Sequence, residues 1–172
     1  MSSRFPIILA TLMLTFQVSP AADAPNPAKP PGAAEITKIE QVLTEVPRDV
    51  LRNVQSGPTK EKSATEATDS LRTKVEGRTA TLKFKVDKVE KYQRKNEKED
   101  RYRIKAEDLR VRDNVIALKG YLWVHLDLSE NAKVPAIKKG SQISVTGKVS
   151  VATITSKATP ELHVDLSDAT IN

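Results

Sequence analysis

Apolar and polar residues alternate along the second half of the chain, from Arg78 to the end, which is the pattern of half-buried β-strands. A first strand is expected over residues 79–86, and its alternation slips at Asp87 and Lys88, as it does at a β-bulge. After a charged segment the alternation resumes over residues 101–107. The two segments predict a long hairpin with a polar outer face.

Three more strands follow this hairpin. The third is expected over residues 116–128, where Gly120 would relieve strand curvature, and residues 129–139 predict a short helical connection. The fourth strand begins near Gly140 and turns four apolar residues inward, Ile143, Val145, Val149 and Val151. The fifth follows Pro160 and turns inward Leu162, Val164 and Leu166. Five strands with a helix between the third and fourth are the order of an OB-fold barrel, so the fold class is mainly β.

One or two amphipathic helices are predicted before the barrel. Between Ile36 and Val54 the apolar residues recur every three or four positions, and Pro47 is expected to interrupt the helix. A second helix would follow a cap at Thr59 and end at Gly77, with a weaker apolar stripe. An apolar stripe must be buried, so we expect these helices to pack on the barrel.

Short motifs in the last two strands add to the alternation. They are Lys139-Gly140, the run Ile143-x-Val145-x-Gly147, and Asp168-Ala169 near the end of the chain. With these motifs, the region from Thr59 to Asn172 resembles bacterial exported OB-fold proteins of the tRNA anticodon-binding-like group. The resemblance implies the OB fold. It implies no catalytic or binding residue, because the exported members of that group look like domains without an assigned function.

The first residues have the layout of a secretory signal peptide. Arg4 precedes the apolar run 5–18, and a segment of small residues follows it as far as Ala24. The run is shorter than the roughly 20 apolar residues that cross a bilayer, so we expect cleavage and no retained membrane anchor. The sequence therefore predicts an exported protein, either periplasmic or secreted.

The chain divides into four predicted segments. They are a signal peptide at 1–22, a Pro-rich disordered linker at 23–35, a helical N-terminal extension at 36–77, and an OB-fold β-barrel domain at 78–172. Prolines cluster in the linker and disfavour both helix and sheet there. The chain has no Cys, which excludes disulfides and thiolate chemistry.

The positive charge of the chain is concentrated in the first hairpin of the barrel. The chain carries a net charge of +6, and the stretch from Lys83 to Arg112 holds 12 Lys or Arg residues against 7 Asp or Glu residues. A basic field of this kind attracts anionic partners, and salt screens the attraction.

The outer face of the second and third strands is the main candidate site, because OB barrels usually bind oligonucleotides or oligosaccharides there. Cations hold anionic groups, and aromatic rings stack on bases or sugars. The candidate ligand-binding residues are Lys83, Lys85, Arg101, Arg103, Lys105, Tyr121 and Trp123. In the alternative interpretation, which the sequence favours, the two aromatic residues receive the apolar stripe of the first helix, since that helix needs a partner.

A second candidate is a metal site built from a repeated His-x-Asp pattern. Its four residues are His125, Asp127, His163 and Asp165. The third and fifth strands of an OB barrel run in parallel, and a spacing of two turns each His and Asp to one face, where they would suit zinc. The simpler interpretation is that polar residues alternate with Leu and Val by register alone, and the sequence favours it.

No nucleophile elbow, Walker loop, HExxH motif or catalytic pair of carboxylates occurs in the sequence, so we expect neither enzymatic activity nor a cofactor. We expect a non-enzymatic binding module whose ligand is an anionic polymer or surface. The alternative is a protein-interaction or scaffold domain that docks a partner through its helices or strand edges. Nucleic acid is the third possibility, because export would remove the chain from most of it.

Overall fold

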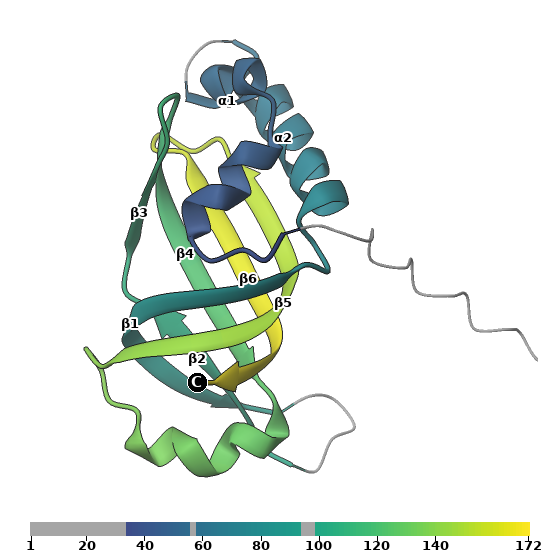
Figure 1. Cartoon of the computed structure of the whole chain (residues 1–172). Helices are drawn as coiled ribbons and strands as arrows, with labels where there is room; N and C mark the ends of the chain where they lie inside the picture. Colours follow the sequence, from purple (N-terminus) through teal and green to yellow (C-terminus); the bar gives the residue numbers. More distant parts are fainter. Residues whose placement is uncertain (1–33, 56–57, 94–98) are drawn as a thin grey trace, which may run out of the picture.

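The computed structural model describes residues 34–55, 58–93 and 99–172 (Figure 1). The predicted signal peptide at 1–22 lies outside these ranges, and so does the predicted linker at 23–35 except for its last two residues. Of the helices in these ranges, none is both long and apolar enough to cross a membrane.

Within the described ranges, six strands form one sheet that closes into a barrel (Figure 1). Their bounds are β1 Thr79–Tyr92, β2 Arg101–Ala106, β3 Leu109–Arg112, β4 Ala117–Leu126, β5 Gln142–Thr155 and β6 Glu161–Ile171. They follow the order β2-β1-β5-β6-β4-β3, and β2 also pairs with β4, which closes a barrel of five strands and leaves β3 as an extra strand. The pair β4 and β6 is parallel. The predicted mainly β fold, a five-stranded OB barrel preceded by helices, is confirmed.

The strands β1 and β4 each divide their length between two neighbours. Residues 79–85 of β1 pair with β5, whereas residues 86–92 pair with β2 beyond the predicted bulge. In the same way, β4 pairs with β3 over residues 117–120 and with β2 over residues 123–125. The first half of β1 therefore has β5 on one side. On its other side, among the described residues, it has a single bridge between Ile36 and Ala80.

The extra strand β3 explains the glycine in β4. The sequence pattern does not predict β3, because four residues are too few to establish an alternation. A Cβ at Gly120 would lie 2.5 Å from Cγ2 of Val111 and 3.1 Å from Cβ of Leu109, both on β3. We attributed Gly120 to strand curvature; the structure corrects this, because the glycine is needed for the close approach of β3.

The inner face of β5 departs from the predicted alternation at one residue. Val151 was expected to point inward, but it is 37% exposed, whereas Ala152 and Ile154 are buried. The pairing of β5 with β6 shifts register between Val149 and Val151. An irregularity of this kind reverses the side-chain phase beyond it, so the prediction for Val151 is wrong.

In the described residues before the barrel there are three helical segments, η1 Ile39–Glu45, α1 Arg48–Gln55 and α2 Lys60–Lys74. The predicted helix start at Ile36 is wrong, because Ile36 bridges to Ala80 and the 3-10 helix η1 begins at Ile39. Pro47 separates η1 from α1, as predicted. α1 packs on α2 and α2 packs on β5, so these helices cover one end of the barrel, while the 3-10 helix η2, Leu128–Ala136, lies at the other end (Figure 1).

Two buried polar side chains tie the helical segments to the barrel. Arg78, at the start of β1, donates to the carboxylate of Glu45 at 2.6 Å and to a main-chain carbonyl before η1 at 2.6 Å. Glu130, in η2, accepts a hydrogen bond of 2.9 Å from the main-chain N–H of Ile171 at the end of β6. Both ends of the barrel are thus joined to their helices by charge-assisted hydrogen bonds.

Candidate functional site

Side chains from four strands form one row across the outer face of the barrel. Lys105 of β2 pairs with Trp123 of β4, which in turn pairs with Asp165 of β6. On the far side of β2, Lys88 of β1 pairs with Lys105. We call the surface around this row the β2–β4 face, and its residues are Lys88, Tyr92, Arg103, Lys105, Lys119, Tyr121, Trp123, His125 and His163.

Trp123 is half-buried and is covered by two cations. The guanidinium carbon of Arg103 lies 4.4 Å from the centre of the indole, and Nζ of Lys88 lies 5.2 Å from it. A cation above an aromatic face is attracted by the negative charge of that face. The interpretation that the first helix covers this indole is wrong, because the helical segments pack on one another, on β5 and on β3.

Tyr121, two residues earlier on β4, is also enclosed by charged and aromatic groups. Its ring stacks on the imidazole of His163 with a centroid distance of 4.8 Å and an angle of 17°. Nζ of Lys119 lies 4.9 Å from the same ring, and Nζ of Lys105 lies 5.9 Å from it. Hydrogen bonds to Tyr121 and then to Asp108 raise the pKa of Lys119, which secures its positive charge.

Carboxylates hold the ends of these cations in place. Glu90 of β1 accepts from Nε of Arg103 at 2.8 Å and also pairs with Lys88. Asp87 pairs with Lys105 at 3.2 Å. Hydrogen bonds from Lys88 and Arg103 lower the pKa of Glu90, and hydrogen bonds from Lys139 and Lys105 lower that of Asp87. The cations therefore have fixed positions, and the net charge of the face is smaller than its cation content suggests.

Asp165 of β6 is a carboxylate in the same row as Trp123. It lies beside Trp123 in the register of β4 and β6, and it is half-buried. Burial raises the pKa of Asp165, while the charges of His125, His163 and Arg103 oppose that rise. Because no ion pair within the described part of the chain neutralises it, this carboxylate lowers the affinity that the centre of the face has for anions.

The structure brings together part of the predicted ligand-binding set. Arg103, Lys105, Tyr121 and Trp123 share the β2–β4 face, and Arg101 lies at the end of β2, paired with Tyr92. Lys83 and Lys85 do not extend this face. They lie on the part of β1 that pairs with β5, opposite Ser144 and Gln142.

Sequence reasoning missed three residues of the face, Lys88, Tyr92 and Lys119. Lys88 follows the bulge in β1, where the register shifts after Val86, and it therefore faces outward with the second half of the strand. The bulge was visible in the sequence, so continuing the alternation with the shifted phase would have found Lys88 and Tyr92. Lys119 lies two residues before Tyr121 on β4, so the alternation of that strand would have placed it on the same face.

The four residues proposed as metal ligands do not converge. His125 contacts a tyrosine hydroxyl at 3.1 Å, Asp127 accepts a hydrogen bond at the start of η2, and His163 contacts a glutamate at 3.2 Å. Asp165 lies in the row of Trp123. In the described ranges, no group of three or more His, Cys, Asp or Glu side chains is arranged to hold a metal ion.

No protein-family model matches the sequence. No curated protein matches it either. Among solved structures, the chain is similar to a lipoprotein of Klebsiella pneumoniae that is described as a candidate nucleic acid-binding protein. The two share 12% sequence identity with a TM-score of 0.43, over 81% of this chain and 91% of that chain.

Proposed function

We propose that the protein is a non-enzymatic binding module that takes an anionic polymer on the β2–β4 face. The observation that carries the proposal is the position of Arg103, whose guanidinium lies 4.4 Å from the centre of the Trp123 indole. Lys88, Lys105 and Lys119 are held above the aromatic rings in the same manner. The face thus carries a row of cations with fixed spacing, which suits a ligand with repeated negative charges.

The geometry favours contact through charged groups over stacking. The ring of Tyr121 already stacks on His163, and cations lie above both Tyr121 and Trp123. A base or sugar ring would have to displace these groups in order to stack. An anionic group needs only to compete with the carboxylates of Glu90 and Asp87, which hold the cations in the free protein. The proposed ligand therefore carries repeated sulfate, carboxylate or phosphate groups.

The proposed location is outside the cytoplasm, in the periplasm or secreted. It is supported by the signal-peptide layout of residues 1–22 and by a sequence without Cys, whose fold needs no particular redox state. We favour polysaccharides and other surface polyanions over nucleic acid as the ligand, because an exported protein is separated from most nucleic acid. The absence of recognised catalytic motifs from the sequence supports a role in binding.

A titration followed by tryptophan fluorescence tests the proposal, because Trp123 is the only Trp of the chain. Heparin, polygalacturonate and single-stranded DNA serve as probes, with neutral dextran as the uncharged control. We expect a polyanion to change the Trp123 emission and the affinity to fall steeply between about 50 and 200 mM salt. Which of the three probes binds best identifies the anionic group.

Variants localise the binding. Arg103→Glu and Lys105→Glu are expected to weaken binding by at least about tenfold, since each reverses a charge at the centre of the face. Lys62→Glu makes the same change on an exposed residue of α2 and should leave the affinity nearly unaltered. A response to dextran equal to that of the polyanions, or equal losses in all three variants, contradicts the proposal.

A further inference from the structure

The edge of β1 that faces away from β5 is bonded at both ends of residues 79–85 and not between them, among the described residues. Thr81 donates its main-chain N–H to the carbonyl of Ile36 at 2.8 Å, and Ile36 donates to the carbonyl of Thr79 at 3.1 Å. Four residues further on, the N–H of Glu107 donates to the carbonyl of Lys85 at 2.8 Å. These bonds all lie on the side of β1 that faces away from β5.

Lys83 lies between these two points, and its main-chain N–H and carbonyl have no hydrogen-bond partner among the described residues. In an antiparallel pair, successive residues alternate between bonding the partner strand and pointing away from it. The main-chain N–H and carbonyl groups of Thr79, Thr81 and Lys85 point away from β5, and by the same alternation so do those of Lys83. Among the described residues no hydrogen bond reaches the N–H or carbonyl of Lys83 on that side. The pairing of Ile36 with β1 therefore does not continue to Lys83, because the chain after Ile36 turns into η1.

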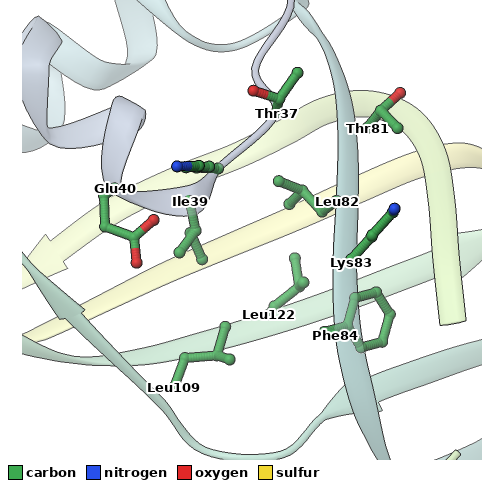
Figure 2. Close-up of a pocket in the computed structure, with 10 residues that line it drawn as sticks. Thr37, Ile39, Glu40, Thr81, Leu82, Lys83, Phe84, Leu109 and Leu122 are labelled. Carbon is green, nitrogen blue, oxygen red and sulfur yellow. The ribbon is translucent and has the colours of Figure 1, made fainter. Parts of the chain in front are cut away.

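An apolar pocket lies beside this edge. It has a volume of about 570 Å³ and lies between η1, β1, β3 and β4. Ile39, Leu82, Leu109 and Leu122 lie along it, as Figure 2 shows, and Phe84 and Lys83 continue it along β1. An extended segment placed along the edge of β1 would alternate its side chains between this pocket and the outer surface.

The strands β1 and β3, which contribute residues to the pocket, carry exposed basic residues. Lys83, which lines the pocket, and Lys85 are exposed on β1, as are Arg110 and Arg112 on β3, and none of the four forms an ion pair within the described ranges. This contrasts with the β2–β4 face, where Arg103, Lys105 and Lys119 are paired with carboxylates. Glu40 is the one acidic residue among the ten that line the pocket.

We propose that this groove, formed by the edge of β1 at Lys83, the pocket and the exposed basic residues of β1 and β3, binds an extended acidic peptide segment of a partner protein. The segment adds a strand to β1 by bonding the N–H and carbonyl of Lys83. Its alternate apolar side chains enter the pocket, and its acidic side chains meet Lys83, Lys85, Arg110 and Arg112. Main-chain bonds supply affinity, and the charges and pocket supply specificity. The groove and the β2–β4 face have no residue in common, although Arg110 of the groove pairs with Lys119 of that face in the register of β3 and β4.

A synthetic heptapeptide of alternating Glu and Val, acetylated and amidated at its ends, is the probe. In the free protein, amide hydrogen exchange at Lys83 should be fast, while Leu82 and Phe84 should be protected by their bonds to β5. Addition of the peptide should shift the amide signals of Lys83 and Lys85 in a nitrogen-proton correlation spectrum and slow the exchange of Lys83.

Matched peptides and variants separate the contributions. A peptide with Lys in place of Glu, and one N-methylated on the amides that face β1, should each bind at least about tenfold more weakly. Lys83→Glu and Arg110→Glu should lower the affinity for the acidic peptide by a similar factor. Arg103→Glu on the β2–β4 face and Lys62→Glu on α2 should leave that affinity unchanged. A thermal melt of each variant confirms that it folds.

Several results would overturn this proposal. They are equal binding of the N-methylated peptide, equal binding of the Lys-containing peptide, and peptide binding that leaves the Lys83 amide unshifted. Displacement of the peptide by heparin with the same shifts at Lys83 would assign the groove to a polyanion instead. Because Arg103→Glu tests the β2–β4 face alone, failure of one proposal is distinguishable from failure of the other.

Discussion

The guanidinium of Arg103 lies 4.4 Å from the centre of the Trp123 indole, although the two residues are not direct partners in the sheet. Arg103 pairs with His125, and Trp123 pairs with Lys105, so the contact is diagonal across β2 and β4. Diagonal neighbours on one face are within reach of long and aromatic side chains. The contact explains how a half-buried indole is covered without a helix.

Replacing Arg103 with Ala should expose this indole. We expect the emission of Trp123 to shift to longer wavelength and the free energy of unfolding to fall by about 0.5–1 kcal/mol, the usual worth of a cation–π contact at an accessible site. Fluorescence spectra and urea unfolding measure both effects. Arg112→Ala, which removes an exposed Arg from β3, is the control. Unchanged emission in Arg103→Ala would show that the contact does not persist in solution.

Gly120 should not tolerate Ala unless Val111 changes as well. The new Cβ would lie 2.5 Å from Cγ2 of Val111, so β3 would have to move away from β4. We expect Gly120→Ala to lower the free energy of unfolding by roughly 1–3 kcal/mol, as overpacking does. In the double variant with Val111→Ala, the two losses should be less than additive. Strict additivity in chemical denaturation would mean that the two residues do not press on each other.

The sequence predicted the five barrel strands because each of them alternates over five residues or more. It did not predict β3, which has four residues, nor the irregularity that turns Val151 outward. Both depend on pairing with a distant strand, and a local pattern contains no information on such pairing. The start of η1 was misplaced for the same reason, since Ile36 is held by its bridge to Ala80.

Replacing Arg78 with either Met or Lys should lower the stability of the protein. Its guanidinium donates to Glu45 and to the carbonyl of Ala34, each at 2.6 Å, and its side chain is only 11% exposed. We expect Arg78→Met to lower the free energy of unfolding by roughly 1.5–3 kcal/mol, since it removes hydrogen bonds of a charged group. Arg78→Lys should recover less than half, because an ammonium lacks the planar fork that reaches two acceptors.

Thermal and chemical denaturation of both Arg78 variants measure these losses. Arg72→Met on α2, whose side chain is 66% exposed, is the matched control and should change little. Full rescue by Lys would show that only the charge is needed, and the hydrogen bond to Ala34 would then contribute nothing.

Glu130 should make the stability of the protein depend on pH. The N–H of Ile171 first, and Lys133 second, hold the pKa of Glu130 below its ordinary value. A carboxyl with a lowered pKa stabilises the fold fully above its unfolded-state pKa, near 4.5, and this contribution is lost as the pH falls through the folded-state pKa.

Compared with wild type, Glu130→Gln should therefore be less stable by roughly 1–2 kcal/mol at pH 7, since it loses a charge-assisted hydrogen bond. The difference should shrink as the pH falls below about 4.5. Urea unfolding across this pH range measures it. A difference that is constant with pH would assign the loss to packing and not to the carboxylate.

The sequence predicted the residues at the centre of the candidate site, but it did not predict which residues surround them. The alternation of β2 and β4 placed Arg103, Lys105, Tyr121 and Trp123 on one outer face, and the register confirms that placement. Lys83 and Lys85 lie apart from it because β1 changes partner at its bulge, from β5 to β2. The carboxylates that neutralise the cations come from β1 and the β2 to β3 connection. Glu90 faces Arg103 directly in the β1–β2 hairpin, and the register of that hairpin depends on the bulge after Val86.

The position of β6 in the sheet determines when the barrel can close during synthesis. β6 comes after all the other strands along the chain, yet it lies between β4 and β5 and makes extensive pairings with both. Until Glu161–Ile171 has left the ribosome, two strands of the future barrel have unsatisfied edges that face one another. Closure of the barrel therefore has to wait until the residues of β6 have been synthesised, and until then the edges of β4 and β5 can pair only with other segments.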